Sequence, residues 1–145
     1  DWSSDVCSSD LISDEMVSTI DLAASMAALA GMDLPDDGIL DSFNVLDALL
    51  GKRGAKGRKF IVSQDNGLRG NYGLRVGNWK LQRHDAKTMY NGDLSMTMWS
   101  VPRFSLFNLE EDIKETTDVS DQNPEVFDRL KNQLQFIIDQ GRTRP

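Results

Sequence analysis

The spacing of apolar residues along the chain changes twice, and these changes predict where helices and strands lie. Apolar residues recur every three or four positions over residues 18–31 and 124–140, which is typical of helices that bury one face. Over residues 59–109 the spacing shortens to two, which is typical of half-buried strands. We therefore expect helices first, several strands in the middle, and one helix at the end.

The first predicted helix has clear boundary signals. Ser18 and Asp21 have the spacing of a capping box, so the helix should begin at Ser18 and end before Gly31. Its apolar residues recur at helical spacing and are expected to pack on a neighbouring element: Ile20, Ala24, Ala27 and Ala28.

A shorter helix is predicted over residues 42–50, with Ser42 as its N-cap and Gly51 as its stop. Its apolar side would consist of Val45, Leu46, Leu49 and Leu50. The segment at 51–59 contains three glycines and five basic residues, which we interpret as an exposed loop. A phosphate-binding loop is the alternative, but this segment lacks the Gly-Lys-Ser/Thr ending of a P-loop.

The middle of the chain predicts a small antiparallel sheet. Strands are expected at 59–63, at 72–84 as a hairpin turning at Gly77 and Asn78, at 94–101 and at 103–109. In the hairpin, Leu74, Val76, Trp79 and Leu81 are expected to supply apolar contacts. In the strand at 94–101, Leu94, Met96 and Met98 alternate with Ser95, Thr97 and Trp99.

The last helix has the most complete set of signals. Asn123 is a suitable N-cap, Pro124 suits the first turn, and Gly141 ends the pattern. One apolar stripe runs along it: Val126, Phe127, Leu130, Leu134, Ile137 and Ile138. The predicted fold class is α+β, a small antiparallel sheet packed by a C-terminal helix and preceded by further helices.

Composition limits the possible partners. The 145 residues carry a formal net charge of -7, which disfavours a nucleic-acid partner because phosphate repels acidic surfaces. No apolar run approaches the roughly 18 residues of a membrane span, so we expect no membrane partner. Cys7 is the single cysteine, so no disulfide within the chain is possible.

Residues 1–11, DWSSDVCSSDL, resemble the in-frame translation of a common short-read sequencing adapter. Such scars are excluded from fold reasoning, and we expect this leader to be disordered and dispensable. The alternative is a disordered Ser/Asp-rich arm. The adapter interpretation places Cys7 outside the authentic protein and predicts that the gene is cut at its 5′ end.

Four segments in order resemble the C-terminal part of the sulfatase family. They are VSTIDLAASMAALAG at 17–31, DSFNVLDALLG at 41–51, RVGNWKL at 75–81 and LFNLEEDIKETTDV at 106–119. In that family the last segment usually has Pro-Gly where Ile113 and Lys114 stand, so this turn should be altered. The stretch KTMYNGDLSMTMW has no evident counterpart.

The resemblance implies an arylsulfatase-like parent enzyme with an alkaline-phosphatase-like α/β catalytic domain. Residues 12–57 would be the end of that domain and residues 58–145 the C-terminal subdomain. The family uses a formylglycine nucleophile, made from a Cys or Ser, and a calcium ion to hydrolyse sulfate esters. The implied location is periplasmic or extracellular.

The catalytic residues of that family are not expected in this chain. Ser9 and Leu11 follow Cys7 where the formylglycine motif needs Pro and Arg. Asp65 and Asn66 resemble the metal-ligand turn of the family. In the family this turn precedes the helix that begins Val-Ser-x-x-Asp-Leu, whereas here it follows the corresponding helix at 17–31, so we interpret it as an ordinary turn. We therefore predict an inactive fragment, with no bound calcium, whose partner is the missing N-terminal catalytic domain.

Four residues are candidates for substrate binding. Arg69, Asn71 and Tyr72 lie in a Gly-rich loop that could border the parent's pocket. His84, the single histidine, is a further candidate, although a lone histidine without a paired base or nucleophile is more often a surface residue at a strand end. The ligand would be a sulfated small molecule or glycan. The alternative to an enzyme fragment is a non-catalytic binding module.

Overall fold

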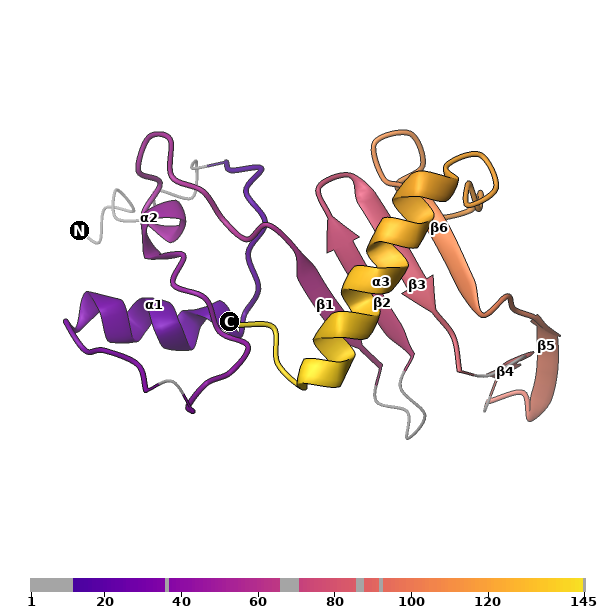
Figure 1. Cartoon of the computed structure of the whole chain (residues 1–145), viewed down its shortest axis with the longest axis horizontal. Coiled ribbons are helices and arrows are strands. Elements are labelled where there is room, and N and C mark those ends of the chain that lie inside the picture. Colours follow the sequence, from indigo (N-terminus) through magenta and orange to yellow (C-terminus); the bar gives the residue numbers. More distant parts are fainter. Residues whose placement is uncertain (1–11, 36, 66–70, 86–87, 92, 145) are drawn as a thin grey trace, which may run out of the picture. The chain divides into compact units, whose positions relative to one another are not determined.

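The computed structural model describes residues 12–35, 37–65, 71–85, 88–91 and 93–144. The 1–11 leader, Asn66 and Arg69 lie outside this set. The chain forms two compact units, Asp1–Arg58 with Arg144–Pro145, and Lys59–Thr143 (Figure 1). No helix in the described part is long and apolar enough to cross a membrane.

The second unit is built on a four-stranded antiparallel sheet in the order β1-β2-β3-β6. The strands are β1 (Ile61–Gln64), β2 (Tyr72–Val76), β3 (Trp79–Arg83) and β6 (Phe104–Asn108). Gly77, with φ of 58°, closes the two-residue turn between β2 and β3, as the sequence predicts. Only glycine adopts this left-handed conformation without strain, so the glycine sets the register of the hairpin.

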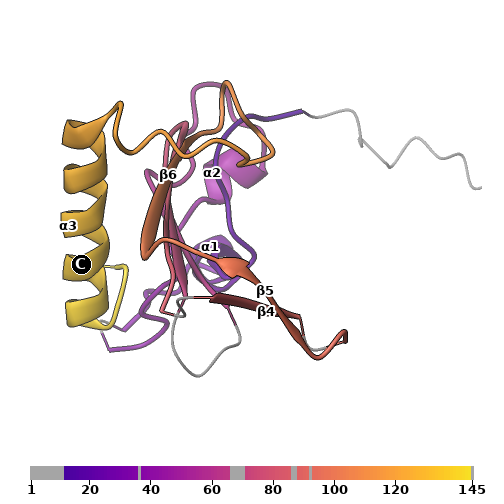
Figure 2. The same ribbon diagram turned by 90° about the vertical axis from the view of Figure 1, so that its right-hand side faces the viewer.

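Helix α3 (Pro124–Gln140) covers one face of this sheet (Figure 2). Leu74, Leu81 and Leu106 stand opposite one another on β2, β3 and β6, and all three are fully buried. The helix contributes the other half of this core: Leu130, Leu134 and Ile137. The predicted α+β class, hairpin and apolar stripe are confirmed, because side chains alternate across a strand and recur at 3.6 residues along a helix.

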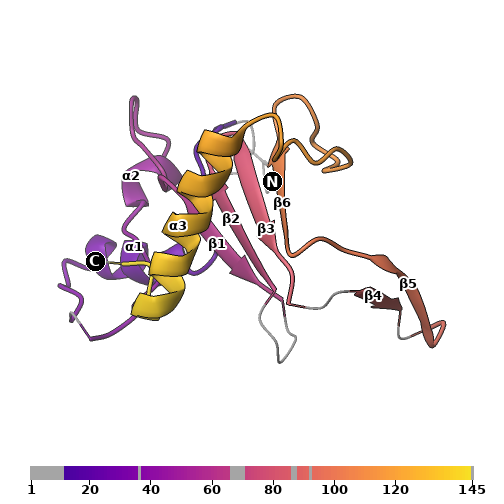
Figure 3. The ribbon, with the colours of Figure 1, turned by 45° about the vertical axis from the view of Figure 1, so that its right-hand side comes forward.

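A separate two-stranded hairpin, β4 (Thr88–Asn91) and β5 (Met96–Ser100), lies outside this sheet (Figure 3). The strand predicted over 94–101 is therefore present as β5, in a hairpin separate from the four-stranded sheet. Leu94 and Met96 are 61% and 49% exposed. Alternation predicts two different faces, but it cannot show whether anything packs on either of them.

The first unit contains α1 (Asp21–Leu29) and α2 (Leu46–Leu49). Both helices are shorter than predicted. Helix α1 begins three residues after Ser18, whose backbone N–H donates to the Asp21 carboxylate at 2.9 Å. The predicted cap Ser42 does not cap α2, because its Oγ instead accepts the Ala24 N–H at 2.9 Å. The glycines predicted to end the three helices all have left-handed φ, namely Gly31, Gly51 and Gly141.

Helix α1 buries its polar side and exposes its apolar side. Asp21, Ala24 and Ser25 are buried, whereas an apolar stripe at i, i+4 and i+7 faces solvent: Leu22, Met26 and Leu29. Ile20 is 46% exposed, as expected for a residue that the catalytic domain would cover in the parent, whereas Ala24, expected to be exposed with it, is only 2% exposed. Ala24 lies on the buried side because hydrogen bonds of Asp21, Ala24 and Ser25 hold this side of the helix against its unit.

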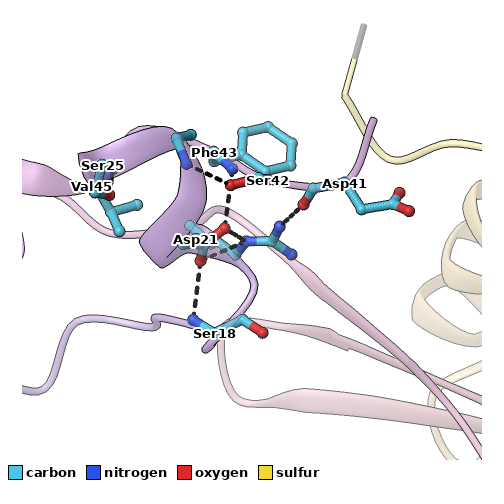
Figure 4. Close-up of polar contacts among 9 residues, drawn as sticks. Ser18, Asp21, Ser25, Asp41, Ser42, Phe43 and Val45 are labelled. Atoms are coloured by element: carbon cyan, nitrogen blue, oxygen red, sulfur yellow. Dashed lines mark hydrogen bonds and ion pairs between the residues drawn. The ribbon is translucent and has the colours of Figure 1, made fainter. Parts of the chain in front are cut away.

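A network of polar side chains holds the first unit together (Figure 4). Ser42 Oγ and Ser25 Oγ accept the N–H groups of Ala24 and Val45, so each hydroxyl links α1 to the segment before α2. Arg58, part of the segment predicted to be an exposed loop, is 6% exposed and donates to the Asp41 carbonyl. The prediction failed for this residue because basic composition alone does not reveal a buried acidic partner.

Candidate functional site

A hollow of about 450 Å³ opens at one end of the four-stranded sheet in the second unit. The register places Gln64, Tyr72, Arg83 and Phe104 side by side at this end. The lining residues come from β1, β2, β3 and the segments that follow them: Ser63, Gln64, Asp65, Asn71, Tyr72, Gly73, Lys80, Gln82, Arg83, His84 and Val101.

The floor of the hollow depends on a glycine. Ser63, Gly73 and Gln82 occupy neighbouring register positions, alternating with the leucines that face α3. A Cβ at Gly73 would lie 2.8 Å from Ser63 Oγ and 3.7 Å from Lys80 Cε. A larger residue at position 73 would therefore fill the space between these two side chains.

Asn71, just before β2, forms hydrogen bonds with residues that follow β1 and β3 at the rim of the hollow. Its Nδ2 donates to Asp65 Oδ2 at 2.5 Å, and its Oδ1 accepts the Asp85 N–H at 2.8 Å. Its backbone carbonyl also accepts the Asp65 N–H. Because its amide is already engaged on both sides, Asn71 shapes the rim more than it offers free groups to a ligand.

Asp85 forms ion pairs with two arginines, Arg83 and Arg103. Its Oδ1 lies 3.2 Å from Arg83 Nη2 and 3.3 Å from Arg103 Nη2. The Arg83 guanidinium also stands 5.7 Å from the centre of the Tyr72 ring. Within the described part of the chain, the buried Nε of Arg83 has no hydrogen-bond partner. Tyr72 therefore helps to hold Arg83 at the rim.

A turn after β6 reaches back to Lys80 and Gln82. Glu115 Oε1 accepts a hydrogen bond from Lys80 Nζ at 2.6 Å, and its Oε2 accepts one from the Gln82 amide. Glu115 has φ of 56°, a left-handed conformation that costs about 1–2 kcal/mol for a residue with a Cβ. Its side-chain contacts hold this strained position in place.

Asp112 stabilises the turn that presents Glu115. Its carboxylate accepts the N–H groups of Thr117 and Thr116 at 2.8 Å and 2.6 Å. Donation from Thr117 is the main reason why the pKa of Asp112 lies below its usual range. The turn predicted to be altered at Ile113 and Lys114 is therefore closed by Asp112.

The structure brings three of the four predicted binding residues to one place. Asn71, Tyr72 and His84 all line the hollow, and Arg69 lies outside the described residues. In the described part of the chain, no hydrogen bond engages the His84 ring, and only its backbone N–H is bonded, to the Arg103 carbonyl. The ring is therefore available to a ligand.

Sequence reasoning missed Ser63, Gln82 and Glu115. Strand alternation could have found Gln82, because it follows the buried Leu81 and must face away from α3. Nothing local could have found Glu115, whose partner Lys80 is 35 residues away. Trp79 packs against the core as predicted, but Lys80 forms an ion pair that was not foreseen.

The described residues do not fit a calcium site. They contain no cluster of three or more His, Cys, Asp or Glu side chains that could hold a metal. Calcium takes six to eight oxygen ligands, and Asp65 is engaged with Asn71. No metal-dependent step can be assigned to these residues.

Solved structures with the same fold identify the class of protein. A Bacteroides thetaiotaomicron 6S-sulfatase, solved in work on the metabolism of multiple glycosaminoglycans, has a TM-score of 0.69 and 32% identity, covering 81% of this chain and 24% of that one. The structure of Ps i-CgsB has a TM-score of 0.61 over 83% of this chain and 24% of its own. At 22% identity that likeness concerns the fold alone. The first of these neighbours is a sulfatase by name.

A sequence relative makes the assignment more specific. The N-acetylgalactosamine-6-O-sulfatase of Bacteroides thetaiotaomicron is 32% identical over 123 residues, which is 84% of this chain. No family model matches the chain. The chain is therefore sulfatase-like, and the matched part is a C-terminal portion of that relative. It spans about a quarter of the relative's length, 23%.

Proposed function

We propose that this chain is the C-terminal part of a sulfuric ester hydrolase and that the catalytic centre lies in an N-terminal portion. The observation that carries the proposal is the similarity of 84% of this chain to 23% of an N-acetylgalactosamine-6-O-sulfatase. The alignment leaves about three quarters of that relative unmatched, and we assign the nucleophile to this part.

The proposed parent would use a formylglycine nucleophile to attack the sulfur and a calcium ion to stabilise the sulfate oxygens. Both groups are assigned to the N-terminal portion, because the described residues of this chain form no metal cluster. The family resemblance is the support for placing the enzyme in the periplasm or outside the cell.

The hollow at the sheet end is the proposed contribution of this chain to substrate binding. Its lining includes the polar side chains of Ser63, Gln64 and His84, which can form hydrogen bonds with the hydroxyl groups of a sugar. His84 offers an unengaged ring, and Asn71 and Tyr72 shape the rim. The substrate class would be a sulfated amino sugar or glycan, as the relative's name suggests.

The exposed stripe on α1 is the proposed contact with the N-terminal catalytic domain. Leu22, Met26 and Leu29 form one apolar line, and Met32 next to it is 65% exposed. Exposed apolar patches of this kind mark lost partners, and the partner here would be an apolar surface of the missing domain.

Expression of the full-length gene tests the proposed function. We expect the sequence upstream to encode a formylglycine motif, and the full-length protein to release sulfate from N-acetylgalactosamine 6-sulfate. The chain alone should release none, with or without calcium. Turnover by the repurified chain, or an upstream sequence without a catalytic domain, would contradict the proposal.

A non-catalytic binding module is the second candidate, favoured by the fact that the hollow lies entirely within the second unit. Hydrogen exchange distinguishes the two. In an enzyme fragment, amides of α1 should exchange much faster than those of α3, because α1 lacks its partner. Equal protection of the two helices would favour the self-sufficient module.

A further inference from the structure

The described cations around the hollow are each paired with a carboxylate. Lys80 Nζ lies 2.6 Å from Glu115 Oε1. Arg83 Nη2 and Arg103 Nη2 lie 3.2 Å and 3.3 Å from Asp85 Oδ1. Lys80 and Arg83 line the hollow, and each is paired with a carboxylate that does not itself line it.

This charge balance works against the binding of a sulfate group. Anions are recognised by cations whose charge is not already compensated, and most strongly by a free guanidinium fork. Here the positive potential of Lys80 is cancelled at short range by Glu115, and both groups are more than two-thirds buried. Among the described lining residues, the groups left to a ligand are the Ser63 hydroxyl, the Gln64 amide, the His84 ring and the Nε of Arg83, whose guanidinium is already paired with Asp85.

We propose that Glu115 is a specificity-determining residue, and that by neutralising Lys80 it makes the hollow bind the uncharged, hydroxyl-rich part of a sulfated glycan instead of its sulfate group. The inference rests on the proposed function, since it concerns how this site would contribute to a sulfatase. Glu115 acts on the ligand through Lys80 and Gln82, so it is a positioning residue. Glu115 has a left-handed backbone, and its hydrogen bonds with Lys80 and Gln82 hold its carboxylate in this strained position.

An NMR titration of the ¹⁵N-labelled chain tests the inference. The probes are N-acetylgalactosamine and N-acetylgalactosamine 6-sulfate, followed through the amides of Gly73, Gln82 and His84. We expect the wild-type chain to bind both sugars with dissociation constants within about threefold. In Glu115→Gln, which keeps the shape but removes the charge, the sulfated sugar should bind about tenfold more tightly and the neutral sugar unchanged.

Glu110→Gln is the matched control, because it makes the same charge change on a residue bonded to Asn78 and outside the hollow. It should change neither constant. A second variant, Lys80→Met, keeps the test informative if Glu115→Gln unfolds. It should retain the neutral sugar and weaken the sulfated one, because Glu115 is then uncompensated.

Three results would overturn the inference: a wild-type preference of tenfold or more for the sulfated sugar, an unchanged ratio in Glu115→Gln, or no binding of either sugar. Each leaves the proposed function standing, because sulfate release by the full-length enzyme is measured separately. Conversely, an inactive full-length protein with the expected selectivity would remove the sulfatase proposal and leave a saccharide-binding hollow.

Discussion

Arg58 and Asp21 form a fully buried ion pair, with Arg58 Nε 2.9 Å from both oxygens of the Asp21 carboxylate. The side chains of both residues are 1% exposed. The same carboxylate accepts the N–H groups of Ser18 and Phe43, and the guanidinium lies 4.5 Å from the centre of the Phe43 ring. One pair thus joins the start of α1 to two other segments of the first unit.

Removing Arg58 should unfold much of the first unit. In Arg58→Met the Asp21 carboxylate stays buried without its cation, which costs about 3–5 kcal/mol. We expect the α1 amides to exchange with solvent hundreds of times faster. Lys52→Met is the control, because its pair with Asp47 is about 60% exposed and worth at most about 1 kcal/mol. Unchanged protection of the Ala24 amide in Arg58→Met would contradict the role assigned to this pair.

Two apolar residues near the middle of α3 should differ sharply in their effect on stability. Leu134 is 1% exposed in the core, so Leu134→Ala should cost about 2–5 kcal/mol through lost burial and a cavity. Phe136 is 60% exposed, so Phe136→Ala should change stability by about 0.5 kcal/mol or less. Urea unfolding of the second unit, followed by tryptophan fluorescence, measures both. Equal losses would mean that α3 is rotated about its axis.

Asp118 should make the second unit sensitive to acid. Partial burial would raise its pKa, but the Ser120 and Leu106 N–H groups that donate to its carboxylate outweigh this and hold the pKa below the usual range. A pKa that is lower in the folded state contributes stability above the unfolded value of about 4. This contribution should disappear as the pH falls through the folded pKa.

In Asp118→Asn, that part of the loss should vanish from a plot of unfolding free energy against pH below about 4. The fold should survive, because Asn Oδ1 can still accept both N–H groups. The control is Asp121→Asn, an exposed residue in the same segment. A variant with the acid sensitivity of the wild type would show that other carboxylates are responsible.

The apolar stripe on α1 should cause self-association when nothing covers it. Leu22→Gln with Met26→Gln should reduce association while changing stability by about 0.5 kcal/mol per site or less, because both residues are exposed. Light scattering at increasing concentration reports the association. Ala24→Gln, on the buried side of the same helix, should unfold α1 instead. A doubly substituted chain that aggregates as readily as the wild type would rule out this stripe as the contact surface.

Part of the candidate site could be predicted from the sequence and part could not. Asn71, Tyr72 and His84 were found because they flank a hairpin whose register follows from its own turn. Their roles were not found, since the Asn71 amide is engaged by Asp65 and Asp85. A local pattern places a residue near a strand end, but it does not show which of its hydrogen bonds are already made.

The sequence by itself determined the β2–β3 hairpin, the face of α3 that carries Leu130 and Leu134, and the glycine stops, because each depends on the spacing of residues within one segment. Only the tertiary structure decided that α1 buries Asp21, and that Lys80 is neutralised by Glu115. The residues of these ion pairs are 37 and 35 positions apart in the chain. Charge compensation acts through space over a few ångströms, so it depends on which segments the fold brings together and leaves no trace in local periodicity.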